Sequence, residues 1–410
     1  MSNTNIITTI DIWSSKIRTI IWGFNPEKNE KFEVFWIWIA HSTAMKKWNI
    51  LDMEEFKNNL DKSLEEAEKM AWQQISNIYL SFNSSSFEVT SAKWVIAISW
   101  EEVTQEDIDR VLDMARNSVE YPNKSILKVI PEFFSVDIED SVKNPIGMFA
   151  RKLEVSAKIF SVNSNILNNI KRSVNDVWIE ISDIYPNLLS SPEWVLKRIQ
   201  KELWVVCIDI WASSTGLTLY EEWVLKHSAI IPLGWDNITN DIALWLRTST
   251  IIAEKLKIEH SVISTTEKEV KEKDIILENL NIWAEWTVCE KYLSQITTAR
   301  YEEIFKYIRD ELIYIWKDWM LPEWAVFVWW SVKTKQFLDS AKENLKLPCF
   351  IWAPVVDDNM SNAYINDPVY SAMVWTMILS NRYNTEPEGF KINIWWFFSS
   401  IWKIIKKLLP

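Results

Sequence analysis

The sequence predicts an α/β protein with two similar lobes, and three observations lead to this prediction. Near the N-terminus, a strand-like run ends in Asp11 and is followed by Trp13 and hydroxyl residues. In the second half, an apolar run typical of a buried strand ends in Asp209 and is followed by Trp211 and hydroxyl residues. Between the two, residues 84–161 have an α+β pattern of their own. The chain is long enough for two or more such domains.

The expected elements follow from residue periodicity and from β-branched and aromatic content. The first lobe should contain strands over 6–10, 19–22 and 33–40, an amphipathic helix over 53–70 and a strand over 77–82. The inserted module should contain strands over 87–98, 125–138 and 153–162, with a helix that begins at the capping-box-like segment 104–107. The second lobe should contain a strand over 205–208, a hairpin over 217–231, a helix that begins in 296–304 and a strand over 325–328.

The two aspartate turns indicate phosphate binding. A strand that ends in aspartate and turns through small hydroxyl residues is a typical approach of a backbone to phosphate and Mg²⁺. We expect Asp11 and Asp209 to hold Mg²⁺ through water. Tryptophan conflicts with this role, because the phosphate needs bare backbone N–H groups in the turn. The predicted phosphate and Mg²⁺ residues are Asp11, Trp13, Ser14, Ser15, Lys16, Asp209, Trp211, Ala212, Ser213, Ser214 and Thr215.

The chain is poor in glycine and rich in tryptophan. It has five glycines and 27 tryptophans, which together make up about 8% of the chain, near the usual share of glycine alone. Trp223, Trp319 and Trp324 stand in turn sequences that favour glycine. We hypothesise that UGA codons read as glycine in the source organism were translated as tryptophan; the alternative is a genuinely tryptophan-rich protein. The indoles expected to fill the phosphate and adenosine clefts in the chain as written are those of Trp13, Trp211, Trp329 and Trp330.

Composition and charge exclude several classes of protein. A net charge of −12 argues against general nucleic-acid binding, which uses basic surfaces. Three cysteines give no disulfide framework and suit a reducing cytoplasm, and three widely spaced histidines show no metal-ligand pattern. The N-terminus has no signal-peptide pattern, and no apolar run is long enough to span a bilayer.

The inserted module carries the most specific resemblance in the chain. Segments 103–107, 126–132 and 144–147 resemble subdomain 1C of the FtsA family of bacterial cell-division proteins. The resemblance extends from about residue 6 to the C-terminus, with the motifs in family order. It implies an actin-like two-lobed ATPase fold with ribonuclease-H-like lobes, an inserted α+β subdomain 1C of the SHS2 type, and a C-terminal amphipathic helix.

The same resemblance implies a division of the chain into nine segments. They are 1–83 (subdomain 1A, first part), 84–161 (1C), 162–198 (1A, second part), 199–235 (2A, first part), 236–304 (2B), 305–360 (2A, second part), 361–380 (return to 1A, in which 368–375 resembles the last connecting helix), 381–393 (flexible linker) and 394–410 (membrane-targeting helix).

Three further motifs resemble the family's adenosine site. With Trp235 read as glycine, residues 234–243 resemble a loop that enters a helix facing the nucleotide. Glu254 and Lys257 share a predicted helix face, where the resemblance implies ribose and adenine contacts; the alternative is a solvated surface ion pair. The strand 325–328 and the residues after it match the adenosine motif. The implied residues are Gly234, Trp235, Glu254, Lys257, Trp329, Trp330, Ser331 and Lys333.

The tail predicts a membrane anchor. Residues 381–393 are polar and contain Pro387 and Gly389, as expected of a linker. The basic amphipathic helix after it is typical of a membrane-surface anchor, and the alternative is docking on its own domain. The family's C-terminal helix tethers it to the inner membrane. The predicted membrane-binding residues are Phe397, Phe398, Ile401, Lys403, Ile404, Ile405, Lys406, Lys407, Leu408 and Leu409.

The resemblance implies an ATP-binding protein that polymerises on the cytoplasmic membrane, peripheral to it and at the division septum. It implies binding of the FtsZ tail through residues 236–304, in which 296–304 resembles a family helix, and recruitment of other divisome proteins. Hydrolysis should be slow at most, because Tyr185 stands where related ATPases have the glutamate of a Glu-Pro motif, and tyrosine is a poor base at neutral pH. ATP should act mainly as a conformational and polymerisation ligand.

Three rival functions share parts of these patterns. A type IV pilus assembly scaffold similar to PilM has the same fold and a 1C-like module, but it should lack the amphipathic tail. A sugar or acetate kinase needs a catalytic carboxylate between the lobes, which the insertion and Tyr185 argue against. A heat-shock chaperone would carry a peptide-binding domain after the ATPase.

Overall fold

The computed structural model describes 13 segments of the chain, which form two compact units. One unit consists of the described residues from 5 to 87 and from 168 to 376, and the other of the described residues from 88 to 167. The predicted linker and tail helix, residues 13–15, 329–331, 333 and 368–375 lie outside the described residues. The described residues are 5–12, 16–25, 31–42, 44–46, 49–72, 74–118, 122–264, 274–276, 287–315, 324–328, 332, 334–352 and 376.

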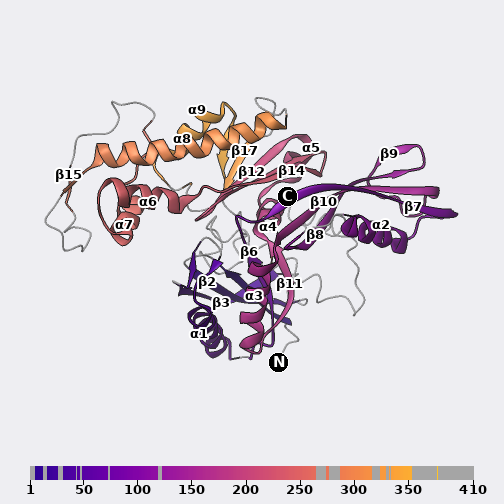
Figure 1. The fold of residues 1–410 in the computed structure, drawn as a ribbon, viewed down its shortest axis with the longest axis horizontal. Helices are drawn as coiled ribbons and strands as arrows, with labels where there is room; N and C mark the ends of the chain where they lie inside the picture. Colours follow the sequence, from indigo (N-terminus) through magenta and orange to yellow (C-terminus); the bar gives the residue numbers. More distant parts are fainter. Residues whose placement is uncertain are drawn as a thin grey trace. The chain divides into compact units, whose positions relative to one another are not determined.

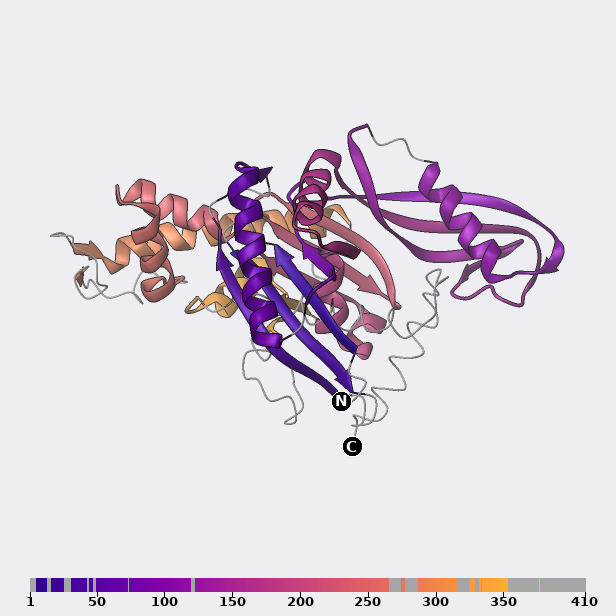
Figure 2. The same ribbon diagram turned by 90° about the horizontal axis from the view of Figure 1, so that it is seen from below.

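A five-stranded sheet forms the first lobe of the larger unit (Figure 1). Its order is β11-β6-β1-β2-β3, in which β1 is antiparallel to β2 and parallel to β6. Helix α1 lies across β2 and β3 (Figure 2), where it buries an apolar stripe that includes Phe56 and Leu60. The elements are β1 (Asn5–Ile12), β2 (Lys16–Asn25), β3 (Lys31–His41), the short pair β4 (Met45–Lys46) and β5 (Asn49–Ile50), α1 (Met53–Ala71), β6 (Asn77–Phe82) and β11 (Glu180–Pro186).

A second sheet repeats this topology. Its order is β14-β13-β12-β17-β18, so β12 is antiparallel to β13 and parallel to β17, as β1 is to β2 and β6. The two strands that end in aspartate therefore hold the same central place in the two lobes. The strands are β12 (Val205–Ile210), β13 (Thr215–Glu221), β14 (Val224–Ile231), β17 (Ala325–Val328) and β18 (Cys349–Ile351).

Helices pack on the second sheet and share its hydrophobic core. Helix α8 begins at Glu290, so the prediction of a start within 296–304 was wrong. The preceding Cys289 makes no side-chain capping bond, so no capping residue in the sequence marks the start of the helix. The remaining elements of this lobe are α6 (Trp235–Trp245), α7 (Thr250–His260), β15 (Asp274–Ile276), β16 (Thr287–Cys289), α8 (Glu290–Tyr314) and α9 (Phe337–Leu345).

Two helices, α4 and α5, connect the two lobes within this unit. Helix α3 precedes β11, and α4 follows it directly, so that α4 and α5 carry the chain from the first sheet to β12. Helix α4 contacts strands of both sheets, since it packs on β11 as well as on β12 and β13. The helices of this part of the chain are α3 (Ser164–Asp176), α4 (Asn187–Val195) and α5 (Arg198–Leu203).

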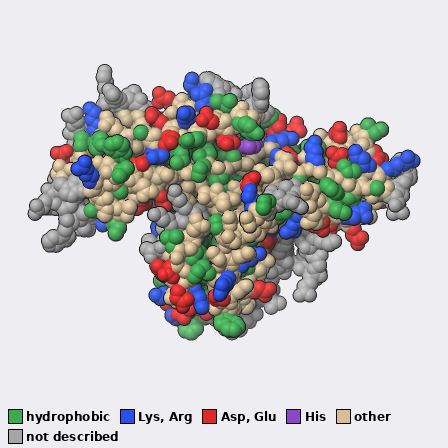
Figure 3. Space-filling view, in the orientation of Figure 1, with side chains coloured by type: hydrophobic (Ala, Val, Ile, Leu, Met, Phe, Trp, Pro, Cys, Tyr) green, Lys and Arg blue, Asp and Glu red, His purple; other side chains and the backbone are tan. Residues whose placement is uncertain are grey.

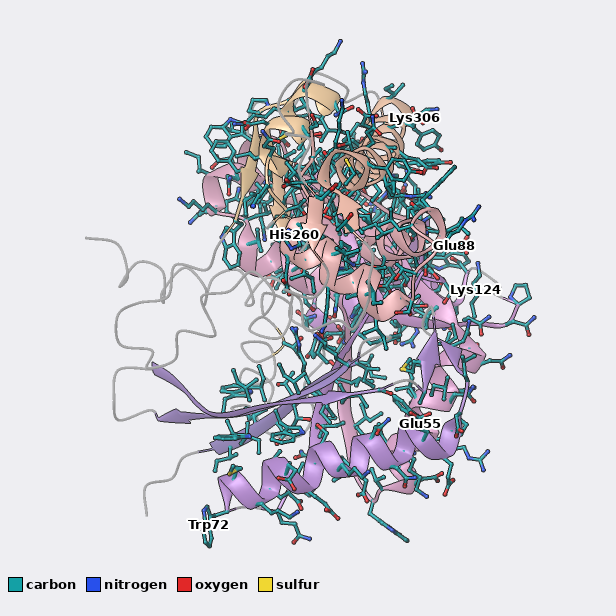
Figure 4. The ribbon with its side chains drawn as sticks, turned by 90° about the vertical axis from the view of Figure 1, so that its left-hand side faces the viewer. Glu55, Trp72, Glu88, Lys124, His260 and Lys306 are labelled. Atoms are coloured by element: carbon teal, nitrogen blue, oxygen red, sulfur yellow. The ribbon has the colours of Figure 1, made fainter. Side chains whose placement is uncertain are left out.

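The smaller unit is an antiparallel sheet of order β7-β10-β8-β9 with α2 on one face (Figure 2). Thr104 caps α2 in the predicted capping box, in which Asp107 accepts a hydrogen bond from the Thr104 backbone. An ion pair joins Glu88 and Lys124, the first residues of β7 and β8 (Figure 4). The elements are β7 (Glu88–Glu102), α2 (Gln105–Asn117), β8 (Lys124–Val136), β9 (Glu139–Val142) and β10 (Phe149–Asn163).

Acidic and basic side chains mix on the exposed face over α1 (Figure 3), where Lys69 pairs with Glu65 and Glu66. This face therefore offers no continuous basic surface of the kind that nucleic acids require.

In the described part of the chain, no helix is long and apolar enough to cross a membrane.

Several tryptophans have a left-handed backbone. Trp72, Trp178, Trp223 and Trp324 have φ values of 54°, 63°, 73° and 81°, which cost a side-chain-bearing residue about 1–2 kcal/mol each. They account for four of the 11 non-glycine residues with positive φ in the described segments. Trp72 ends α1 and projects away from the sheet (Figure 4), 94% exposed. The predictions of a glycine-like backbone at Trp223 and Trp324 are thus confirmed.

Candidate functional site

The two aspartate turns occupy equivalent places in the two repeated sheets. Asp11 is the penultimate residue of β1, Asp209 is the penultimate residue of β12, and both side chains are buried. The next strand places Arg18 opposite Asp11 and Gly216 opposite Asp209. The two carboxylates lie near enough for the charge of Asp11 to raise the pKa of Asp209. The fold therefore brings together two carboxylates that are far apart in the sequence.

The surroundings of Asp209 raise the pKa of its carboxylate. Burial raises its pKa to about 7, while the Ser191 hydroxyl and the nearby Trp211 indole lower it in part and the Asp11 charge raises it further. Ser191 donates to Oδ2 of Asp209 at 2.7 Å. The other oxygen, Oδ1, is buried and accepts no hydrogen bond of standard geometry within the described segments. A buried carboxylate oxygen of this kind is well suited to face a cation.

The residues present fit a Mg²⁺–nucleotide. Mg²⁺ is commonly held by one or two carboxylates together with waters and substrate phosphates. Asp11 and Asp209 supply that number of carboxylates, and the described segments contain no group of three or more acidic, histidine or cysteine side chains that could hold a metal by itself. The protein would therefore hold the ion only in part, and the phosphates of the nucleotide would supply further oxygens.

The second phosphate turn packs against the start of α6. The backbone N–H groups of Trp235 and Asp236 donate to the carbonyls of Trp211 and Ala212, each at 2.7 Å. Gly234 makes this approach possible, because a Cβ there would lie 2.3 Å from the Trp211 carbonyl oxygen. The motif therefore needs a glycine at position 234 for steric reasons.

The backbone N–H of Trp211 differs from the expectation. It is not bare, since it donates to the Ser214 carbonyl at 2.8 Å and closes the turn. The Trp211 side chain is only 2% exposed, and a Cβ added to Gly216 would lie 2.9 Å from both the indole ring and the Leu188 side chain. The indole therefore fills the space between the β13 strand and α4. The indole also lies near the Asp209 carboxylate, whose pKa it lowers, and its occupation of the phosphate cleft stays a prediction.

The predicted pair on α7 is buried in part. Lys257 is 1% exposed and its Nζ contacts Glu254 Oε2 at 2.7 Å, so the solvated surface ion pair is the wrong alternative for this lysine. Thr239 on α6 joins the pair, because it donates to Glu254 Oε2 and accepts from Lys257. Burial lowers the pKa of Lys257 to about 8, although the nearby carboxylates Glu254 and Asp236 oppose this shift.

Trp235 covers this pair. Its ring centroid lies 4.0 Å from Lys257 Nζ, in the geometry of a cation–π contact, and its Nε1 donates to Glu254 Oε1 at 3.2 Å. A glycine at position 235 would leave both charged groups without this cover. The sequence motif therefore places the indole over the residues that the family resemblance assigns to ribose and adenine.

Two observations connect the lobes at this site. Asn83, which follows β6, donates to the Ser214 hydroxyl in the second turn at 3.2 Å. Lys16 of the first lobe is partly buried, which lowers its pKa, and the charge of Glu254 on the second lobe acts against this shift. Residues from both lobes therefore meet around the aspartates.

Several residues near the aspartates were not predicted from the sequence. Asn187 and Ser191 on α4 bond to Asp11 and Asp209, and Thr239 bonds to the α7 pair. No helix was predicted over these residues, so the i, i+4 spacing of Asn187 and Ser191 gave no signal until the structure placed both on α4. Predicted residues outside the described segments are Trp13, Ser14, Ser15, Trp329, Trp330, Ser331 and Lys333.

A separate hollow lies between α6 and α8, with a volume of about 330 Å³. Arg300 makes a two-point contact with Asp241 inside it, with Nε–Oδ2 and Nη2–Oδ1 distances of 2.6 and 3.0 Å. Glu303 also binds this guanidinium. Trp245 and Tyr292 add apolar surface to the lining, and both are partly exposed. The hollow therefore combines a fixed charge pair with aromatic walls.

The duplicated five-stranded sheets, each with an aspartate at the end of its central strand, define the class of actin-like ATPase folds. Known structures agree. The PilM-PilN type IV pilus biogenesis complex has a chain with TM-score 0.67 at 10% identity, and the match covers 93% of this chain and 99% of that one. MreB5 of Spiroplasma citri bound to ADP gives a TM-score of 0.53 at 11% identity, over 92% and 97% of the two chains. At these identities the likeness is one of fold alone.

Sequence comparisons are more specific. A family model described as "SHS2 domain inserted in FTSA" matches residues 85–161, and one described as "Cell division protein FtsA" matches residues 206–374. Cell division protein FtsA of Bacillus subtilis is 30% identical over 76% of this chain and 70% of its own length. The Pseudomonas aeruginosa protein is 25% identical over 90% and 88%. The chain belongs to the FtsA family of cell-division proteins, and the PilM-like alternative is reduced to a likeness of fold.

Proposed function

We propose that the chain binds ATP with Mg²⁺ between its two lobes and uses it as a conformational and polymerisation ligand. The observation that carries this proposal is the meeting of Asp11 and Asp209, buried on equivalent strands of the two lobes, with one oxygen of Asp209 left for a cation. The bound ion would neutralise the phosphates and draw the lobes together. Ser213, Ser214 and Thr215 would face the phosphates, and Glu254 and Lys257 the ribose and base.

Hydrolysis in this proposal is slow at most. Tyr185 is the penultimate residue of β11, directly before Pro186, and it is 5% exposed. A phenol at this place is a poor general base at neutral pH. Phosphate release from ATP should therefore be far slower than in a metabolic kinase, and a turnover of many per second would contradict the proposal.

The test of nucleotide binding is a titration of the protein with ATP, with Mg²⁺ and with EDTA. Binding that strengthens with Mg²⁺ is expected. An Asp209→Asn variant should lose most of the Mg²⁺-dependent gain, because it removes a charged ligand. A Glu311→Gln variant, which changes a carboxylate on α8 that contacts His227, serves as the control. Equal behaviour of the two variants would contradict the assignment of the site.

The nucleotide proposal is tied to a second one, that the tryptophans written in the chain are glycines in the native protein. Its support is the left-handed backbone at Trp72, Trp178, Trp223 and Trp324, together with the glycine shortage. Tandem mass spectrometry of the native tryptic peptide 202–226 tests it, because this peptide contains Trp204, Trp211 and Trp223. Glycine at all three positions is expected. Tryptophan at position 211, or UGG codons, would contradict the proposal.

We propose that the protein works on the cytoplasmic membrane at the septum, where it polymerises, tethers FtsZ filaments and helps recruit other divisome proteins. Membership of the family supports this role, and the basic amphipathic sequence at 394–410 supports attachment. Co-sedimentation of the full chain with anionic vesicles tests the anchor. Changing Lys403, Lys406 and Lys407 to glutamine should weaken binding strongly, since each lysine contributes about 1 kcal/mol near an anionic surface. Binding that survives the change would contradict this anchor.

The hollow between α6 and α8 is the place at which we propose that the FtsZ tail binds. It lies within the predicted outer subdomain 236–304, and its Arg300–Asp241 pair and aromatic walls suit a peptide segment. Arg300→Ala should reduce the affinity for an FtsZ tail peptide at least tenfold. Arg309→Ala, farther along α8 and outside the lining, is the matched control. Equal affinity of both variants would exclude this hollow.

A further inference from the structure

Helix α4 presents two polar side chains to the two aspartates. Asn187 and Ser191 are four residues apart, so they lie on one face of the helix. Asn187 Nδ2 donates to Asp11 Oδ1 at 3.4 Å, and Ser191 Oγ donates to Asp209 Oδ2 at 2.7 Å. One helix face therefore touches both carboxylates, one from each lobe.

The orientation of the Asn187 side chain is itself fixed. Ser81, which lies beside Asp11 in the register of β1 with β6, donates to Asn187 Oδ1 at 2.5 Å. Because the amide oxygen is engaged in this way, its nitrogen is directed at Asp11. Both Asn187 and Ser191 are at most 1% exposed, so water does not compete for these contacts.

The chemistry of the two donors suits a cation site. An amide and a hydroxyl stabilise carboxylates by hydrogen bonds, yet they bring no positive charge that would repel a divalent ion. Ser191 engages only Oδ2 of Asp209 and leaves Oδ1 without a bond of standard geometry among the described residues. A lysine or arginine at either position would satisfy the carboxylate but weaken the site for a metal.

We infer that Asn187 and Ser191 are positioning residues, which hold Asp11 and Asp209 at the separation and orientation that a Mg²⁺–nucleotide requires. This inference rests on the proposed nucleotide binding. The two residues do not touch the nucleotide; they act through the aspartates. Because both come from one rigid helix turn, they set the aspartates of the two lobes relative to each other.

Two neighbouring serines on α4 give a matched test. Ser191→Ala removes the hydroxyl that bonds Asp209, while Ser190→Ala removes an equally buried hydroxyl that donates only to the Pro186 carbonyl. The measurement is the ATP dissociation constant of the full chain, with Mg²⁺ and with EDTA. Ser191→Ala should lose about tenfold of the Mg²⁺-dependent gain in affinity, and Ser190→Ala should keep it. Affinity in EDTA should change little in either variant.

The conservative variant Ser191→Thr keeps the hydroxyl and should restore the Mg²⁺-dependent gain in ATP affinity. This recovery would show that the loss in Ser191→Ala is not caused by misfolding. Asn187→Leu should reduce the gain in the same way as Ser191→Ala. Equal Mg²⁺-dependent gains in Ser191→Ala and Ser190→Ala would overturn the inference while leaving nucleotide binding intact. A parent chain that binds ATP equally with Mg²⁺ and with EDTA would overturn both this inference and the proposed Mg²⁺ site.

Discussion

The two aspartate turns have the same place in the topology but different surroundings. Asp11 has the buried guanidinium of Arg18 opposite it on the neighbouring strand, and Asp209 has Gly216 in that position. Burial is the main reason that the pKa of Asp209 rises to about 7. The comparison teaches that one sequence motif, used twice, can place one carboxylate opposite a buried arginine and the other opposite a glycine.

The largest expected effect comes from replacing each of the two aspartates with asparagine. Asp11→Asn should lower the free energy of unfolding by about 3 kcal/mol, because the buried Arg18 loses the carboxylate on the same sheet face. Asp209→Asn should leave stability unchanged or raise it by about 1 kcal/mol, because it removes a buried charge with no cation opposite it. Urea denaturation of both variants without nucleotide measures the difference. Equal losses would show that the two turns are electrostatically alike.

A second test uses the glycine opposite Asp209. A Cβ on Gly216 would lie 2.9 Å from both the Leu188 and the Trp211 side chains, so Gly216→Ala should cost about 2 kcal/mol in the chain as written. In a Trp211→Gly background, the same change should cost less than about 1 kcal/mol, because one of the two obstacles is gone. Thermal unfolding of the four chains completes the cycle. Additive effects would mean that the indole does not fill this space.

A third test concerns Lys257 on α7, which is 1% exposed, whereas Lys16 at the start of β2 in the first lobe is only partly buried. The pKa of Lys257 is about 8 when folded and about 10.4 when unfolded. Between these values the unfolded chain binds more protons, so this group makes the protein more stable as the pH rises. From pH 7.5 to 9.5, stability relative to Lys257→Met should rise by about 2 kcal/mol. A flat difference in denaturation midpoints would contradict the lowered pKa.

The smallest effects are expected at tryptophans remote from both turns. Trp72→Gly and Trp178→Gly should each raise stability by about 1 kcal/mol, because both side chains are over 90% exposed and both backbones are left-handed. Trp245→Gly is the control, since this tryptophan is 62% exposed but helical. It should lower stability by about 0.5 kcal/mol. Chemical denaturation measures the change in the free energy of unfolding for each variant. A change of the same sign at all three positions would contradict the conformational argument for glycine.

Local patterns accounted for much of the fold. The strand over 77–82, the strand over 325–328 and the capping box at Thr104 and Asp107 form as predicted, because each depends on residues close in sequence. The start of α8 could not be predicted, since its first residues carry no capping side chain and are held by packing on the rest of the lobe. Local signals identify elements well and their ends poorly when no side chain marks the end.

The candidate site was likewise predictable only in the features that depend on residues close in sequence. The sequence by itself determined which residues could approach phosphate, because the order of strand, aspartate and hydroxyl turn is local and occurs twice. Only the tertiary structure decided that α4 touches both aspartates, that Lys257 is buried beneath Trp235, and that Arg18 faces Asp11. These relations join residues up to 176 positions apart. Burial and charge depend on the neighbours that folding assembles, and no local pattern in the chain specifies them.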